Sequence, residues 1–149
     1  MSGRLFALDT SCMVAAVCSW HERHAAAAAG IERRLERGET MAIAAHAIVE
    51  AYAVLTRLPS RHRLAPADAW MLVRTNFVDN AVLVTLDGPA HIAVLDELAL
   101  AGIGGGRAYD ALIAACAEKS GARALLTFNA RHFDPPPRGV AIVEPAHSP

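Results

Sequence analysis

Several features that would place this sequence in a specialised class of protein are missing from it. Its 14 Lys and Arg residues are balanced by 15 Asp and Glu residues, so it lacks the overall positive charge of a general nucleic-acid-binding protein. Its three cysteines contain no C-x-x-C pair, which argues against a zinc ribbon and a disulfide framework. No apolar run approaches the roughly 18 residues of a membrane-spanning helix. Aromatic residues make up only 5% of the chain, so aliphatic residues must form most of the core.

The remaining composition is that of a folded α/β protein. The 149 residues are 54% hydrophobic and 19% charged, which excludes general disorder and fits a single domain over residues 1–149. Short apolar runs alternate with longer helical stretches, as in parallel strands joined by crossover helices. The predicted strands are residues 4–8, 41–44, 81–86, 124–127 and 140–143. The predicted helices are residues 10–20, 21–37, 46–58, 66–80, 88–101 and 109–120. We therefore expect a three-layer α/β/α domain with a short, mostly parallel central sheet of four or five strands.

The N-terminal apolar run does not continue into a targeting sequence. Asp9 interrupts it after residue 8, whereas the apolar region of a signal peptide is longer and uncharged. We expect no signal peptide and a cytoplasmic protein, whose cysteines stay as free thiols.

Three acidic residues lie near the carboxyl ends of predicted strands. Asp9 follows the first strand, Glu50 lies in the first turns of the helix after the second, and Asp110 opens the helix that follows a glycine-rich loop. Ligands of parallel sheets bind at this edge, so we expect the three side chains to share one cleft. Carboxylates crowded in this way stay ionised together only if a cation joins them. Oxygen ligands favour a hard ion such as Mg²⁺ over zinc.

Each acid also has a purely structural interpretation. Aspartate is common at helix N-termini as a cap and as a partner of the helix dipole, and this alone would explain Asp9 and Asp110. Glu50 is more informative because its neighbours on both sides are apolar and acids are rarely buried without a partner. Spacing alone leaves both interpretations open.

Four segments around these acids carry a more specific signal. They are Leu8-Asp9-Thr10-Ser11, Ile48-Val49-Glu50, Gly105-Gly106-Arg107-Ala108-Tyr109-Asp110-Ala111-Leu112-Ile113, and Leu126-Thr127-Phe128-Asn129 with Phe133. In this order they resemble the PIN-domain nucleases, and within them the VapC-like toxin ribonucleases of bacterial toxin–antitoxin pairs. The resemblance runs from about Leu5 to Val143, and the segment that ends in Asp110 and its apolar neighbours is its most specific part.

The resemblance implies a Mg²⁺-dependent endoribonuclease, with Mn²⁺ as a substitute ion, whose acidic centre is formed by Asp9, Glu50 and Asp110. Asn129 takes the place of a fourth acid that the family often has, and His132 stands where many relatives carry another acid. We therefore expect a less negative rim around the site, and the number of metal ions stays open.

The resemblance also implies partners. These are an RNA substrate, a cognate antitoxin whose C-terminal segment covers the acidic cleft, and a second copy of the chain in a homodimer. We expect a partner interface to use apolar residues that the fold leaves exposed, although the same residues would serve equally well as core. The candidates are Met41, Trp70, Met71 and Phe77.

Hydroxyl groups close to the acids are the predicted supporting residues. Ser11 or Thr10, beside Asp9, and Thr127 are candidates to hydrogen-bond the carboxylates or the attacking water. Helix capping or a strand-end position explains each of them equally well.

Two arginines are the candidates for binding RNA phosphates. Arg57 follows Glu50 by seven residues, on nearly the same helix face, and Arg107 precedes Asp110 by three. Surface ion pairs are the alternative for both. His21 and His24 have a metal-ligand spacing, but no third ligand is near them in sequence, so we interpret them as a solvated helix face.

Two other functions stay open. A metal-dependent phosphoryl-transfer domain also places an aspartate after its first strand. One class of such domains has an acid two residues later, where this chain has Ser11, and another has a late lysine near the site, whereas Lys119 lies inside a predicted helix. A catalytically weakened PIN-like binding module is the second alternative, and Asn129 keeps it open.

Overall fold

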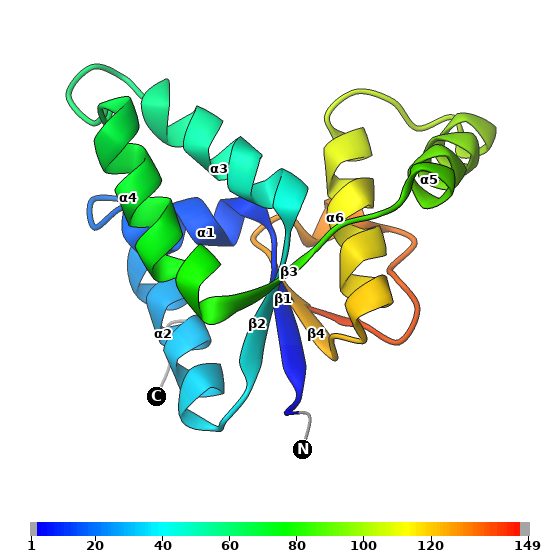
Figure 1. Ribbon diagram of the computed structural model, residues 1–149, viewed down its shortest axis with the longest axis horizontal. Coiled ribbons are helices and arrows are strands. Elements are labelled where there is room, and N and C mark those ends of the chain that lie inside the picture. The colour runs from blue at the N-terminus through cyan, green and yellow to red at the C-terminus, as the bar shows by residue number, and fades with distance from the viewer. Residues whose placement is uncertain (1–2, 147–149) are drawn as a thin grey trace.

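A computed structural model describes residues 3–146 and has a parallel β-sheet at its centre (Figure 1). The sheet has five strands in the order β3-β2-β1-β4-β5, and every neighbouring pair is parallel. The strands are β1 (Leu5–Leu8), β2 (Thr40–Ala44), β3 (Ala81–Val84), β4 (Ala124–Leu126) and β5 (Ala141–Val143). The first strand in sequence therefore lies in the middle of the sheet, with the acid-bearing segments on both sides of it.

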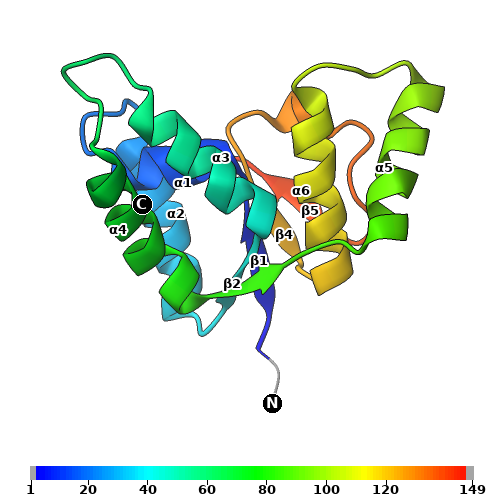
Figure 2. The same ribbon diagram turned by 45° about the horizontal axis from the view of Figure 1, so that its top comes forward.

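Helices cover both faces of the sheet. Figures 1 and 2 show α1 to α4 on one side and α5 with α6 on the other. Their bounds are α1 (Thr10–Val17), α2 (His24–Glu36), α3 (Ala45–Thr56), α4 (Pro66–Asn76), α5 (Gly88–Ala101) and α6 (Arg107–Ser120). Short 3₁₀ turns cover Val78–Asn80 and Ala130–Phe133. This arrangement confirms the predicted three-layer α/β/α class, with all of the observed strand pairs parallel.

The core forms where the inner strands are buried by helices on both faces. Phe6, Leu8, Ile43 and Leu125 are almost fully buried, as expected for strands made of continuous apolar runs. The helix ends follow the predicted stop signals at Gly102 and Gly121, which both adopt the left-handed conformation that glycine takes without strain.

The register of the sheet brings two predicted site residues together. Leu8 of β1 pairs with Leu126 of β4, so the next residues, Asp9 and Thr127, leave the sheet side by side. The Asp9 backbone amide donates to the Leu126 carbonyl at 3.1 Å, which extends the ladder by one bond. The parallel pairing thus brings Asp9 and Thr127, which are 118 residues apart in sequence, into direct contact.

Three predicted helix boundaries were wrong. The first helix ends at Val17 instead of continuing through Trp20, and α2 begins at His24 because residues 18–23 form hydrogen-bonded turns. The predicted helix 66–80 ends at Asn76, after which the chain turns through a short 3₁₀ segment into β3.

Two of the four residues expected at an interface belong to the core. Met41 lies in β2 between β1 and β3, and Phe77 is the C-cap residue of α4. Both side chains are buried. Apolar side chains of this size fill the interior when an inner strand or helix end presents them to it. Trp70 and Met71 are exposed, as that prediction requires. Among the described residues, no helix is both long and apolar enough to cross a bilayer.

Candidate functional site

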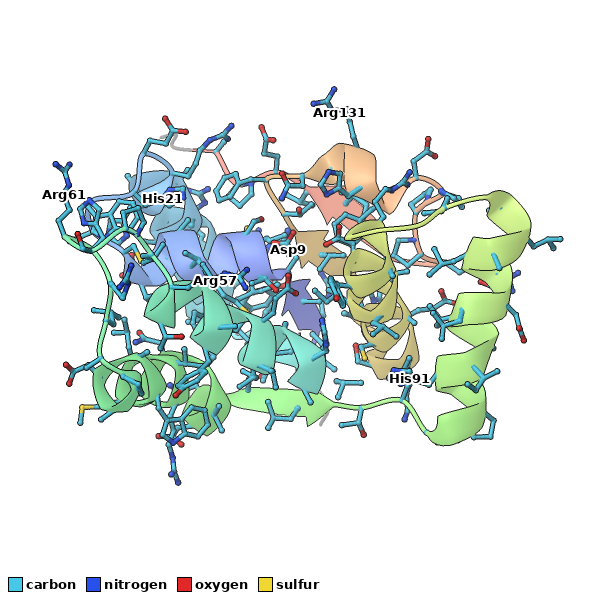
Figure 3. All side chains as sticks on the ribbon, turned by 90° about the horizontal axis from the view of Figure 1, so that it is seen from above. Asp9, His21, Arg57, Arg61, His91 and Arg131 are labelled. Atoms are coloured by element: carbon cyan, nitrogen blue, oxygen red, sulfur yellow. The ribbon has the colours of Figure 1, made fainter. Side chains whose placement is uncertain are left out.

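Asp9 lies at the centre of the carboxyl edge of the sheet (Figure 3). It is the N-cap of α1, where its Oδ1 accepts hydrogen bonds from the Cys12 backbone amide at 3.0 Å and the Ser11 hydroxyl at 2.6 Å. Its Oδ2 accepts a short hydrogen bond from the Thr127 hydroxyl. The residue is only 2% exposed, so these donors replace the water that an ionised carboxylate would otherwise bind. The capping interpretation of Asp9 is confirmed, and the same residue is a buried acid.

Glu50 faces the same end of α1 from the first half of α3. Its Oε1 accepts a hydrogen bond from the Thr10 hydroxyl at 2.9 Å, a contact between residues 40 apart in sequence. The Nε2 atom of His46, one helical turn earlier, lies 3.6 Å from the same oxygen. The Glu50 side chain is 30% exposed, so one side of the carboxylate is held by the protein and the rest reaches solvent.

Asp110 enters the site from the first turn of α6. Its Oδ2 lies 3.1 Å from Nδ1 of His132, in the 3₁₀ turn after β4. The Asp110 side chain is 17% exposed, and that of His132 is 48% exposed. His132 therefore carries a nitrogen, in place of an acidic oxygen, to the rim of the site.

Electrostatics link the three carboxylates. Burial raises the pKa of Asp9, and the negative charge of Glu50 raises it further, against the opposing effect of its three hydrogen bonds. Burial also raises the pKa of Asp110; the charges of Asp9 and Glu50 act in the same direction, and His132 opposes them. The charge of Glu50 thus acts on both aspartates, and the charge of Asp9 acts on Asp110.

The arrangement fits a cation that keeps part of its water shell. Within residues 3–146, no three His, Cys, Asp or Glu side chains are close enough together to form a complete set of direct ligands. The donor atoms at the site are carboxylate oxygens, and three bonds to Asp9 leave one of its roughly four lone-pair positions free. Mg²⁺ binds to proteins through few carboxylates and several waters, so this donor set suits it.

The predicted supporting residues lie at different distances from the acids. Ser11 and Thr127 contact Asp9 directly. Asn129 is exposed, and its backbone amide donates to the Thr127 hydroxyl at 2.8 Å. That hydroxyl therefore accepts one hydrogen bond and donates another, which fixes its proton toward Asp9.

The two candidate arginines differ in their surroundings. Arg57 caps the C-terminus of α3 and is exposed. Arg107 is partly buried, and its guanidinium donates to the Asp134 carbonyl at 3.0 Å, so it helps to hold the loop after β4. His21 and His24 hydrogen-bond the backbone of their own turn and of α1, which leaves no metal site in the described residues there.

Sequence reasoning did not identify His46 and His132 as partners of the acids. His46 had a usable signal, because it precedes Glu50 by four residues on a helix. The ring of His46 also stacks on Tyr109 at a centroid distance of 5.1 Å, next to Asp110. His132 is 22 residues from Asp110, and no local pattern joins them.

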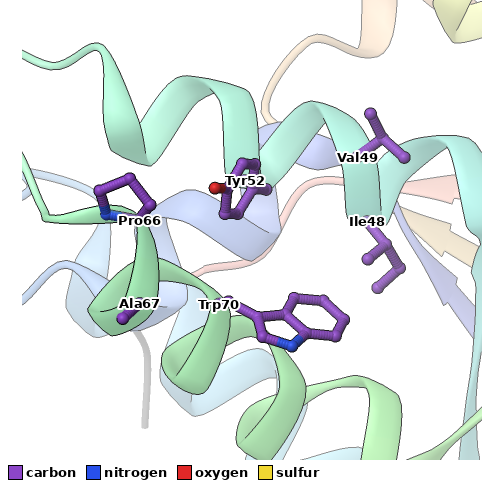
Figure 4. A pocket seen from close by; sticks show the side chains of 6 residues that line it. All are labelled: Ile48, Val49, Tyr52, Pro66, Ala67 and Trp70. Carbon is purple, nitrogen blue, oxygen red and sulfur yellow. The ribbon is translucent and has the colours of Figure 1, made fainter.

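Two hollows lie to either side of the acids. An apolar groove of about 550 Å³ runs between α3 and α4 and is lined by Ile48, Val49, Tyr52, Pro66, Ala67 and Trp70 (Figure 4). A second, more polar cavity of about 540 Å³ lies between α5, α6 and the loop of residues 134–138, with His132 and Arg107 in its wall.

Comparison with known proteins gives consistent matches. The model of the PIN domain family matches residues 6–136. Ribonuclease VapC40 of Mycobacterium tuberculosis is 39% identical over 121 residues, which cover 81% of this chain and 84% of that protein.

Solved structures share the fold. The structure of VapC20 from M. tuberculosis, described as a sarcin-ricin loop cleaving toxin, superimposes with a TM-score of 0.67 at 18% identity and covers 91% of this chain and 98% of that one. VapBC-5 from M. tuberculosis, a member of the VapBC family of toxin–antitoxin systems, matches with a TM-score of 0.52 at 17% identity, over 94% of this chain and 98% of that one.

Proposed function

The chain belongs to the PIN domain family, and from that premise we propose that it is a Mg²⁺-dependent endoribonuclease that acts as the toxin of a toxin–antitoxin pair. The observation that carries the proposal is the convergence of Asp9, Glu50 and Asp110 from three separate elements on one edge of the sheet. The name of the 39% identical relative, a ribonuclease, supports RNA as the substrate.

Each residue of the centre has a distinct part in the proposed reaction. A divalent cation, when bound, lowers the pKa of a water molecule and neutralises charge that builds on the phosphate oxygens; Mn²⁺ supplies the same chemistry. Asp9 and Asp110 would hold the cation, directly or through water. Glu50, one oxygen of which is fixed by Thr10, would complete the shell of the cation or orient the attacking water.

Hydrogen-bonded neighbours keep two of these acids in place. Thr127 and Ser11 hold the Asp9 carboxylate in one orientation, and His132 holds Asp110. Asn129, at the position of a fourth acid, adds no charge to the centre, and its backbone amide orients the Thr127 hydroxyl. Arg57, and more weakly Arg107, bind phosphates of the RNA on either side.

An antitoxin is the proposed protein partner. The apolar groove between α3 and α4 has Ile48 and Val49 in its wall, on the helix that also carries Glu50. A helical antitoxin segment with an apolar face fits this groove, and a C-terminal segment that continues from it would cover the centre. The VapBC-5 fold match, to a member of a toxin–antitoxin family, supports this assignment.

A homodimer is proposed through α5 and the edge strand β3. No residue of α5 is buried, although the helix is rich in apolar side chains, and Ile92, Leu95 and Leu100 are exposed. Val82 and Leu83 of β3 are also exposed. A second copy of the chain would cover these surfaces. We place the protein in the reducing cytoplasm, which fits its three buried free cysteines.

Cleavage of RNA by the purified chain, with Mg²⁺ or with EDTA, tests the proposed function. We expect Mg²⁺-dependent cleavage that Asp9→Asn abolishes. Asp87→Asn is the matched control, because Asp87 is also a helix N-cap that accepts a backbone hydrogen bond from the third residue after it, but on exposed α5. Equal cleavage by wild type and Asp9→Asn, or no cleavage by any of them, would refute the enzyme and leave the binding module.

A further inference from the structure

Trp20 and His62 form an exposed aromatic stack that the proposed reaction centre does not use. Trp20 lies in the turn between α1 and α2, and His62 lies in the loop between α3 and α4. Their ring centroids are 4.0 Å apart with an interplanar angle of 17°. Trp20 remains 46% exposed, so the stack buries only part of the indole. The stack therefore leaves nearly half of the indole open to solvent.

Both loops that carry the stack are held by their own hydrogen bonds. The His21 backbone amide donates to the Cys18 carbonyl at 2.9 Å, and the Arg23 amide donates to Nδ1 of His21 at 3.0 Å. In the facing loop, the His62 amide donates to the Pro59 carbonyl at 2.8 Å. The rings are therefore positioned before any ligand arrives, which lowers the entropy lost on binding.

The surroundings of the stack are cationic. Between Glu50 and Asp68 the sequence contains three arginines and no acid. Arg61 donates from Nε to Nε2 of His62 at 3.1 Å, which fixes the imidazole beside it. The facing turn contains one acid and one base, Glu22 and Arg23. The Arg23 guanidinium lies over the Phe128 ring, and its Nη1 atom is 3.9 Å from Oε2 of Glu144. The net charge next to the stack thus comes from the α3–α4 loop.

The stack lies on the same edge of the molecule as the acids. α1 leads from Asp9 toward the turn that holds Trp20, and its eight residues span about 12 Å. α3 runs alongside it from Glu50 to Arg57, where the arginine-rich loop begins. Seen from above, Arg57 lies between Asp9 on one side and His21 and Arg61 on the other (Figure 3).

We propose that the Trp20–His62 stack, with Arg57 and Arg61, binds a single-stranded segment of the RNA substrate a few nucleotides away from the scissile phosphate. A base stacks on the indole and extends the Trp20–His62 stack, while the arginines contact the adjoining phosphates. Stacking on an aromatic side chain accepts any base, so this site contributes affinity and orientation rather than sequence choice. An acidic protein segment would pair with the arginines but would gain little from the stacked rings. The inference rests on the proposed ribonuclease function.

Binding of a fluorescein-labelled single-stranded RNA, followed by anisotropy, tests the site in a Glu50→Gln background that does not cut the probe. We expect Trp20→Ala to weaken binding by about tenfold, as the loss of one stacked base does, and Trp20→Phe to retain most of the affinity. His62→Ala should also weaken binding, whereas His91→Ala, the matched change on α5 at the far side of the molecule, should leave it unchanged (Figure 3).

The salt dependence of binding tests the arginines. We expect Arg61→Ala to reduce the slope of log K against log salt by about 0.7, the value for one single-strand phosphate contact. Arg74→Ala, an exposed arginine on α4 that pairs with Asp79, is the matched control and should leave the slope unchanged.

Kinetics separate this site from the reaction centre. In the active chain, Trp20→Ala should raise KM for a long single-stranded RNA with little change in kcat, and it should not affect a substrate too short to reach the stack. If the parent chain cuts RNA but Trp20→Ala binds it with unchanged affinity, the stack is not an RNA site and the nuclease proposal stands. If Trp20→Ala instead loses affinity for the antitoxin alone, the surface belongs to that protein and the inference is wrong. If the parent neither binds nor cuts RNA, both proposals fail.

Discussion

Replacement of Thr127 by valine gives the sharpest test of how the buried acid is held. The Thr127 side chain is fully buried, and its hydroxyl makes two hydrogen bonds, one to the Asp9 carboxylate and one from the Asn129 amide. Valine has nearly the same shape, so the change removes the hydrogen bonds and leaves the packing almost intact. Asp9, at 2% exposure, has little access to water that could replace the lost donor.

The magnitude follows from these two contacts. A hydrogen bond to a charged group contributes about 1.5–3 kcal/mol and a neutral one about 0.5–1.5 kcal/mol, so we expect Thr127→Val to lower the free energy of unfolding by about 2–4.5 kcal/mol. In a chain of this length, that corresponds to a fall in Tm of roughly 5–15 °C. Urea denaturation at neutral pH measures the difference, since the two chains should share one m-value.

A double-mutant cycle with Asp9→Asn isolates the charged contact. In the Asp9→Asn background the hydroxyl faces a neutral amide, so Thr127→Val should destabilise less, with a coupling of about 1–2 kcal/mol. Thr56→Val is the matched control, because that hydroxyl bonds only to carbonyls of its own helix; it should change stability by less than about 0.5 kcal/mol. A loss below about 0.5 kcal/mol for Thr127→Val, or strict additivity in the cycle, would refute this account of Asp9.

Two further predictions concern the charge of the site and the exposed helix. Asp110→Asn should raise the Tm of the metal-free protein at neutral pH and remove its stabilisation by Mg²⁺. The pKa of Asp110 is raised in the folded state, so the ionised side chain of the wild type destabilises the fold at neutral pH. The gain in Tm should therefore disappear below pH 3.8, the ordinary pKa of the group, where wild-type Asp110 is also neutral. Differential scanning fluorimetry measures both effects. A gain in Tm that persists below this pH, or a Mg²⁺ stabilisation that is unchanged in the variant, would contradict the prediction. Leu95→Lys on α5 should convert the proposed dimer into a folded monomer in light scattering after gel filtration, and a dimer that survives would exclude that face.

Much of the fold was predictable because local signals agree with the tertiary structure. Asp87 and Gly102 mark the two ends of α5, and each adopts the capping conformation that its residue type favours. The boundary error at the end of α1 shows the limit of these local signals. Trp20 continues the apolar pattern of α1 but lies in the turn that follows it, where the indole packs on His62, 42 residues later in sequence, and helix periodicity contains no information on that contact.

The placement of the acids near one edge of the sheet could be predicted, as could the contacts of Ser11 and Thr127 with Asp9, whereas the histidine partners could not. Parallel strands end at one edge, so the positions of Asp9, Glu50 and Asp110 after predicted strands or loops were enough to expect a shared cleft. The order of the strands decides which side chains touch, and that order is set by long-range packing. Thr10 and His132 each contact an acid that is distant in sequence. The first contact depends on how α1 and α3 pack, and the second on how α6 packs against the turn after β4.

Binding of Mn²⁺, measured from the electron paramagnetic resonance signal of the free ion, tests most directly whether the three acids form one cation site. The account predicts that Asp9→Asn, Glu50→Gln and Asp110→Asn each weaken binding by about tenfold or more, whereas Asp87→Asn binds like wild type. Wild-type affinity in any of the first three variants would show that the carboxylate concerned lies outside the site.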